Sequence, residues 1–500
     1  MKARIWLALA IVPVLVLGCA RRRGVENMVL LPAHDDPTVS FRFLFQVGSQ
    51  DDPPGKEGLA ALTAALLTEG STQKRPYEEI LDLLYPMAAS ISEQVDKEVT
   101  VFAGRVHKDH LARFYDLFKE VLLEPSFREE DFVRVKTDFL NHIRNTLRYA
   151  DDEELGKEAL YQFIFRGSPY EHLEEGTVAG LESITLDDVR EFYRKYYTRD
   201  RLVIGLGGGF EAGFPERVCK DFAILPAGTA PRVPAPEPER FEGIHVRIIE
   251  KDVPATAISF GFPIEVLRGS RDFYALALAT SWLGEHRNSF SHLYQVIREA
   301  RGLNYGDYAY IEHFPNGGRR QFPPPNVPRR RQIFQIWIRP VPNEARLFAF
   351  RAALRELQKL VDQGMTKEQF ELTRKFLKGY LLHYAPTTDL RLGYALDDRF
   401  YGIDGHYLDN FRRALDELTL EEVNAAIRRH LQYRNIKVVF VTRGAAELKE
   451  ALISNAPSPI SYPTPKPTEV LEEDREIATY PLAVKPENVE IVPVDVVFER

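Results

Sequence analysis

The feature that most constrains the fold is a pattern of predicted helices and turns that occurs twice along the chain. Apolar residues at helical spacing predict an amphipathic helix over 110–122, and the same spacing returns over 348–361. The sequence Thr-Leu-Asp-Asp-Val from Thr185, with the threonine as N-cap, returns as Thr-Leu-Glu-Glu-Val from Thr419. The copies lie roughly 235 residues apart, and repetition at that scale indicates duplicated domains instead of a short-repeat array.

Predicted strands and one linker complete this organisation. Residues 39–47 place apolar side chains on one face by alternation, which predicts a half-buried strand. A stretch rich in proline and alanine, 225–240, separates an N-terminal domain over 29–224 from a C-terminal domain over 241–455. A proline-rich tail over 456–500 follows. The predicted fold class is α+β, with two homologous domains in tandem, each a largely antiparallel sheet covered by helices.

One further irregular stretch, over 314–331, contains five prolines and five arginines and interrupts an expected pair of strands. It is expected to form a long mobile loop. Such a loop is either solvated without function or grips a substrate or partner.

The first residues predict export. Lys2 and Arg4 precede a short apolar run that ends at Cys19, which indicates a signal peptide over 1–18 and a spacer over 19–28. The run resembles a bacterial lipoprotein signal, which implies that Cys19 carries lipid; the alternative is a membrane anchor whose cysteine is incidental. Because Ala20 follows instead of aspartate, the resemblance implies the outer membrane, with the protein facing the periplasm.

Composition excludes some classes of function. With 44% hydrophobic residues in 500, the chain has ample material for buried cores. The formal charge of −8 argues against nucleic acid as a partner. Cys219 is the one other cysteine, so no intramolecular disulfide is expected once Cys19 is lipidated.

The stretch from Gly58 to Ser71 reads Gly-Leu-Ala-Ala-Leu-Thr-Ala-Ala-Leu-Leu-Thr-Glu-Gly-Ser, which by itself predicts an alanine-rich core helix. It resembles the signature helix of the pitrilysin/insulinase family of zinc peptidases, in which Gly-Leu-Ala is followed by His-x-x-Glu-His. On that frame the functional positions fall on Ala61, Ala64 and Ala65, whose methyl groups bind no zinc and accept no proton. The third zinc ligand of the family falls on His142, which by itself cannot hold the metal. We therefore expect no cofactor in this chain.

A second motif of the same family is intact. The sequence Leu293-Tyr-Gln-Val-Ile-Arg-Glu-Ala-Arg-Gly-Leu-Asn-Tyr305 resembles its second-domain helix, in which an arginine and a tyrosine seven residues later reach across the chamber. The resemblance implies that Arg298 and Tyr305 bind the substrate backbone and stabilise the oxyanion. The alternative is structural: Arg298 as a solvated helix residue and Tyr305 as a sheet residue.

Other candidate sites are weaker. The glycines that follow the predicted strand at 201–206 lack the spacing of a dinucleotide-binding loop. His107 and His110 lie near each other without a third ligand at suitable spacing, and Cys219 has no histidine nearby in sequence.

The resemblance implies half of a peptidase clamshell, in which a peptide adds to a sheet edge. We therefore expect a catalytically incomplete subunit of a heterodimeric periplasmic metallopeptidase, inactive alone. It would supply Arg298 and Tyr305 to a partner of the same family that binds the zinc. The alternative is a non-catalytic scaffold or peptide-binding lipoprotein of an envelope complex. An independent enzyme would need another set of metal ligands, which the sequence does not offer.

Overall fold

The computed structural model describes residues 27–500. The predicted signal peptide, Cys19 and most of the spacer lie outside these residues. No helix within residues 27–500 combines the length and the hydrophobicity needed to cross a membrane.

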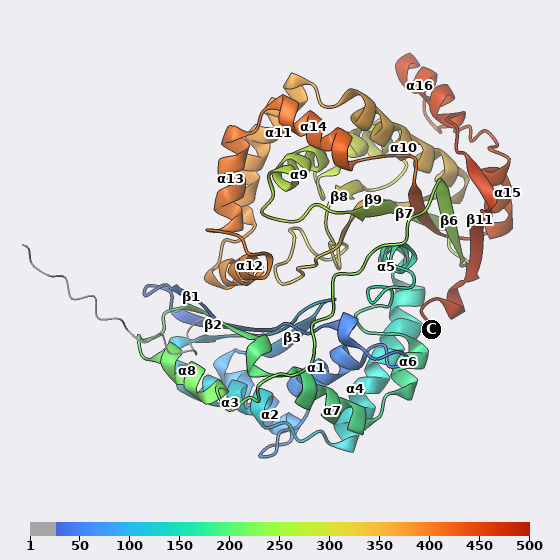
Figure 1. Cartoon of the computed structure of the whole chain (residues 1–500). Coiled ribbons are helices and arrows are strands. Elements are labelled where there is room, and N and C mark those ends of the chain that lie inside the picture. The colour runs from blue at the N-terminus through green and yellow to red at the C-terminus, as the bar shows by residue number, and fades with distance from the viewer. Residues whose placement is uncertain (1–26) are drawn as a thin grey trace, which may run out of the picture.

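Each domain is built on one sheet (Figure 1). The strands of the first domain are β1 (Met28–Pro32), β2 (Thr38–Phe45), β3 (Ile91–Val95), β4 (Thr100–His107) and β5 (Leu202–Gly208). They lie in the order β1-β5-β2-β4-β3, and all neighbours are antiparallel except β1 and β5. Residues 39–47 therefore include a strand, as alternation predicted, and β3 forms one edge of the sheet.

The second sheet has six strands. They are β6 (Ile244–Glu250), β7 (Ala255–Ile264), β8 (Asp307–Tyr310), β9 (Gln332–Pro342), β10 (Ile436–Thr442) and β11 (Val484–Pro493). Their order is β11-β6-β10-β7-β9-β8, with β6 parallel to both β10 and β11 and the other pairs antiparallel. The predicted α+β class with two similar domains is confirmed.

Helices cover both sheets. Those of the first domain are α1 (Leu59–Thr68), α2 (Tyr77–Leu84), α3 (Leu111–Leu123), α4 (Glu129–Asn141), α5 (Asp152–Ile164), α6 (Val178–Ser183), α7 (Leu186–Tyr196) and α8 (Phe214–Phe222). Those of the second are α9 (Arg271–Gly284), α10 (Arg346–Gln363), α11 (Lys367–Tyr380), α12 (Thr388–Tyr401), α13 (Tyr407–Glu417), α14 (Leu420–His430), α15 (Ala445–Ile453) and α16 (Thr468–Ala478). Two π-helical segments, η4 (His142–Ala150) and η6 (Tyr294–Glu299), occur near the predicted site residues.

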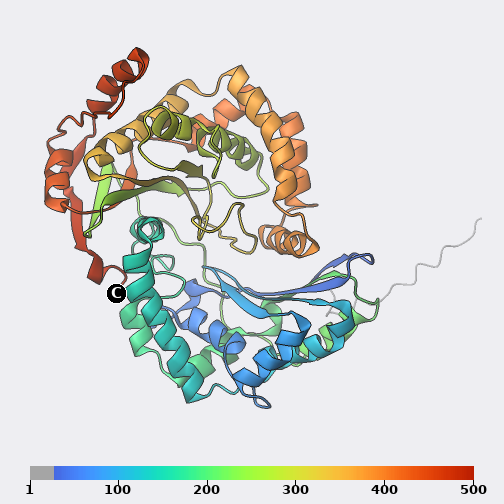
Figure 2. The same cartoon turned by 180° about the vertical axis from the view of Figure 1, so that it is seen from behind.

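The two domains exchange one helix each. Helix α5 of the first domain packs on β7 and β10 of the second sheet, and α12 of the second domain packs on β1, β2 and β5 of the first (Figures 1 and 2). The two helices begin about 235 residues apart, at the offset of the internal repeat. The exchange fixes the relative orientation of the domains because each sheet buries a face against the other domain's helix.

The exchange also explains the glycines of β5. A side chain at Gly205 would lie 3.2 Å from Leu396 of α12, and one at Gly207 would lie 3.0 Å from Thr388. The glycine-rich run therefore lets a helix approach the sheet closely, which is a packing role.

The two irregular segments are ordered parts of the domain interface. The stretch over 314–331 is not a mobile solvated loop, because Arg329 is buried and pairs with Asp96 at 2.6 Å and with Glu174 at 2.9 Å. The C-terminal segment is more than an extended tail, since it forms α16 and adds β11 to the second sheet. Its end then returns to the first domain, where Arg148 donates to the carbonyl of Val497. The pattern of apolar residues cannot predict the Arg329 or the Arg148 contact. Both contacts join a charged side chain to a group that is far away in the sequence.

Candidate functional site

Helix α1 begins where a buried carboxylate replaces the missing N-cap side chain. Gly58 precedes the helix with φ of 106°, a conformation that favours glycine. The Asp52 carboxylate accepts hydrogen bonds from the backbone N–H groups of Gly58 and Ala60, both at 2.7 Å. All ten residues of α1 are buried, which is why alanine and leucine dominate its sequence.

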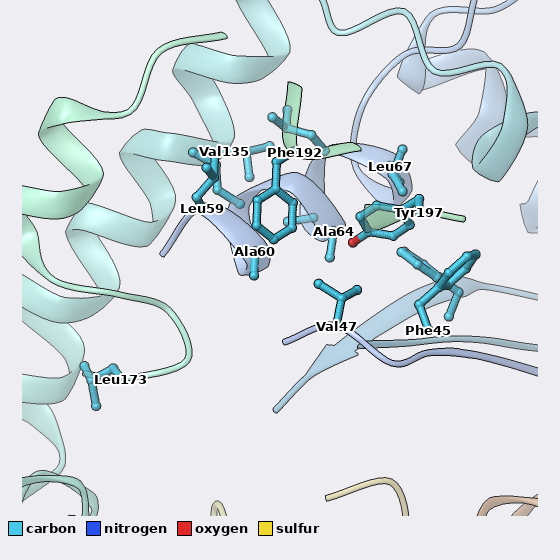
Figure 3. Close-up of a cluster of buried hydrophobic side chains, with 14 of the residues drawn as sticks. Phe45, Val47, Leu59, Ala60, Ala64, Leu67, Val135, Leu173, Phe192 and Tyr197 are labelled. Carbon is cyan, nitrogen blue, oxygen red and sulfur yellow. The ribbon is translucent and has the colours of Figure 1, made fainter. Parts of the chain in front are cut away.

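The three alanines at the family's functional positions differ in what they contact. Ala64 and Ala65 are fully buried in the core of the first domain. Figure 3 shows Ala64 among apolar and aromatic side chains that include Val47 and Tyr197. Ala61 faces a cavity instead. Only one of the three positions therefore borders space that a ligand can enter.

This cavity has a volume of about 520 Å³ and lies between the domains. Its walls include Ala61 of α1, His142 at the start of η4, and Asn316 and Arg320 from the second domain. The structure thus brings Ala61 and His142 to one cavity. The His142 imidazole is exposed and interacts electrostatically with Glu175.

The residues around this cavity do not fit a zinc ion. A catalytic zinc site needs three protein ligands, and the alanines supply none. No group of three or more histidine, cysteine or carboxylate side chains within residues 27–500 is arranged to hold a metal. His142 remains as the one imidazole at a former ligand position.

The edge strand β3 also borders the cavity, through residues 92–95. Asp96, the residue after β3, donates its N–H to the carbonyl of Val99 in the hairpin with β4. In an antiparallel pair, residues that bond to the neighbouring strand alternate with residues that do not. The backbone groups of Glu93 and Val95 therefore point away from β4. An extended peptide can pair with such an edge. The loop of the second domain approaches the same strand, where the Gln94 amide donates to the carbonyl of Asn326 at 2.8 Å.

Charged groups on the cavity wall have perturbed pKa values. Burial opposes ionisation of Glu174, but Lys97 and Arg329 outweigh it and lower its pKa to about 2. Burial and the neighbouring Glu174 raise the pKa of both Glu158 and Glu175. Arg329, Asp96 and Glu174 form a buried charged cluster, which we call the Arg329 clasp. Sequence analysis missed it because Arg329 lies more than 150 residues from either carboxylate.

Arg298 and Tyr305 lie elsewhere. Neither side chain borders the cavity. Arg298 is on η6, with 36% of its side chain exposed, and its one ion pair, with Glu299, is long at 3.5 Å. Tyr305 is 78% exposed in the loop before β8, so it is not a sheet residue. Both groups face solvent and are accessible to another chain.

Comparison with known proteins gives the class. Residues 28–174 match the insulinase family (peptidase family M16), and residues 183–377 match the peptidase M16 inactive domain. The chain therefore belongs to the insulinase family of peptidases. With alanine at positions 61, 64 and 65 of the zinc motif, it is an inactive homologue within that family.

Relatives and solved structures agree with this class. A non-peptidase homologue, YmxG of Helicobacter pylori, is 22% identical over 412 residues, covering 81% of this chain and 89% of that protein. An uncharacterised zinc protease of Bacillus subtilis, also named YmxG, is 23% identical and covers 82% and 95%. The crystal structure of a peptidase M16 inactive domain from Pseudomonas fluorescens superposes with a TM-score of 0.73 at 24% identity, covering 83% of this chain and 95% of that one.

Proposed function

We propose that this chain is the non-zinc subunit of a heterodimeric peptidase of the bacterial cell envelope. In this assembly a family member with an intact His-x-x-Glu-His motif binds the zinc, and this chain supplies Arg298 and Tyr305 to the partner's active site. Lipid on Cys19 attaches the assembly to the outer membrane on its periplasmic side. The substrates are peptides.

The observation that carries the proposal is the contrast between the two motifs. The residues that would bind zinc and accept a proton from water are replaced by alanines, of which Ala64 and Ala65 are buried in the core. The arginine and the tyrosine are kept, and both face solvent outside the chain's own cavity. A guanidinium and a phenol are suited to bind a peptide carbonyl and to stabilise the oxyanion that forms when water attacks it.

The cavity and edge strand β3 have a separate use in this proposal. An extended peptide that pairs with Glu93 and Val95 gains main-chain hydrogen bonds without any chemistry at Ala61. The chain then holds part of a long substrate while the partner's zinc site cleaves another part. The same edge also supports the alternative function, a peptide-binding or scaffolding subunit that takes no part in cleavage.

The test is reconstitution. The chain is purified alone and together with a candidate partner of the same family that carries the His-x-x-Glu-His motif, and zinc content and peptide cleavage are measured for each. We expect zinc and cleavage with the pair, loss of cleavage when the partner's motif glutamate is changed to glutamine, and neither zinc nor cleavage with this chain alone. Zinc-dependent cleavage by this chain alone contradicts the proposal. A stable pair whose turnover equals that of the partner alone favours the scaffold.

A further inference from the structure

Arg298 and Tyr305 lie on a segment whose backbone is anchored by the buried side chain of Arg301. Only 1% of the Arg301 side chain is exposed. Its Nε donates to Asp474 and its Nη2 to Glu473, both at 2.8 Å, and its Nη1 donates to the carbonyl of Val296 at 2.7 Å. We call these three side chains, Arg301, Glu473 and Asp474, the α16 fork. A guanidinium that donates in several fixed directions holds its own backbone in one orientation.

The fork joins this segment to the C-terminal helix α16. Two further contacts support the junction: Lys466 donates to the carbonyl of Ala300 at 2.7 Å, and the Tyr462 hydroxyl donates to Asp474 at 2.8 Å. Glu473 also accepts from Arg355 of α10 at 2.9 Å. The fork is therefore tied to the long helix of the second domain as well as to the C-terminal segment.

The segment itself has features that need such support. Residues 294–299 are π-helical, a rare conformation that occurs mostly as short bulges and often at functional sites. The helix ends at Glu299, and Gly302, whose φ is 72°, follows in the turn after it. Beyond it, the Asn304 side chain donates to Asp307 at 2.7 Å, which fixes the backbone on one side of Tyr305. Arg298 lies within the π-helical segment, one residue before its last residue, Glu299.

We infer that the C-terminal segment positions the Arg298–Tyr305 pair through the α16 fork. Arg301, Glu473 and Asp474 are positioning residues, because they hold the backbone that carries the pair and do not contact substrate. The inference rests on the proposed function, in which Arg298 and Tyr305 act on the partner's substrate. A displacement of about 1 Å in such a pair is enough to lower turnover by roughly 10²-fold.

The test uses the full chain with Glu473→Gln and Asp474→Asn combined. Glu472→Gln, an exposed neighbour on the same helix, is the matched control. Hydrogen exchange of residues 292–305 is measured in the chain alone, and kcat, KM and partner affinity are measured in the pair. We expect faster exchange over 292–305 and a kcat lower by about 10- to 100-fold, with partner affinity unchanged and Glu472→Gln without effect.

A second variant keeps the test decisive if the double variant does not fold. Arg301→Lys keeps the buried charge but loses the fork geometry, so its kcat is expected to lie between those of the wild type and the double variant. Faster exchange with unchanged kcat, in a pair that Arg298→Ala impairs, overturns the inference. So does unchanged exchange in both variants. If Arg298→Ala itself leaves turnover unchanged, the proposed function fails, whereas the exchange measurement still reports whether the fork fixes the segment.

Discussion

Helix α1 and the segment that carries Arg298 and Tyr305 occupy corresponding roles in a peptidase of this family, one for each half of an active site. In this chain α1 is buried along its whole length, and Ala64 and Ala65 are part of the core. The second segment is anchored through Arg301, while Tyr305 is 78% exposed. In this chain the helix that corresponds to the zinc motif is therefore part of the packed core, whereas the segment of the second motif combines an anchored backbone with an exposed tyrosine.

The largest effect is expected from placing an acidic group on α1, which tests whether this helix is now only part of the core. Ala64→Glu places a carboxyl among apolar side chains without a partner, so we expect the free energy of unfolding to fall by about 4 kcal/mol. Urea denaturation of the isolated chain measures it. Ala61→Ser, at the cavity wall, is the control and should cost much less. A loss below about 1 kcal/mol for Ala64→Glu shows that this helix still borders an adaptable site.

The corresponding test of the segment that carries Arg298 and Tyr305 concerns catalysis. Arg298→Ala or Tyr305→Phe should lower turnover of the reconstituted pair by roughly 10²–10³-fold, because each removes a donor to the developing oxyanion. Steady-state cleavage of a peptide substrate measures it, with Glu472→Gln, at an exposed glutamate outside this segment, as the control. Full turnover in an intact complex means that the pair of residues has no catalytic part.

A smaller effect should appear in the pH dependence near α1. Burial, assisted by Lys97, lowers the pKa of His172 to about 4, and this residue lies 3.9 Å from Asp52, which caps α1. Between pH 6.5, the ordinary pKa of histidine, and about pH 4, His172 is protonated in the unfolded chain but not in the folded chain. The free energy of unfolding therefore decreases as the pH falls through this range.

We therefore expect the free energy of unfolding of His172→Asn to fall less than that of the wild type between pH 7 and pH 4, by at most about 3 kcal/mol. Denaturation at several pH values measures the difference. His34→Asn, at an exposed histidine, is the control. Parallel pH profiles for His172→Asn and the wild type would remove His172 as the cause.

The smallest expected effect separates function from stability. Arg298→Ala and Tyr305→Phe should each change the free energy of unfolding of the isolated chain by less than about 0.5 kcal/mol, since both side chains are exposed. Thermal denaturation of each variant measures it. A loss of more than about 1 kcal/mol assigns these residues to the fold and weakens the comparison with α1.

Much of the fold followed from local patterns. The helix over 110–122, the strand over 39–47 and the repeat offset are properties of apolar spacing and N-caps, which act over a few residues. The exchange of α5 and α12 and the Arg329 clasp did not follow, because each depends on partners far apart in sequence. The π-helical turns were not predicted either. The segment over 314–331 was predicted to be mobile for the same reason, because the carboxylates that bind Arg329 are distant in sequence.

The sequence by itself determined which chemistry is missing and which is kept. Alanine at positions 61, 64 and 65 offers neither a zinc ligand nor a proton acceptor there, and the pattern around Arg298 and Tyr305 resembles the second motif of the family. Only the tertiary structure decided that Ala61 and His142 share one cavity while Arg298 and Tyr305 face solvent. The reason is that side-chain identity fixes what a group can do, whereas burial and the path of the distant chain fix what it can reach.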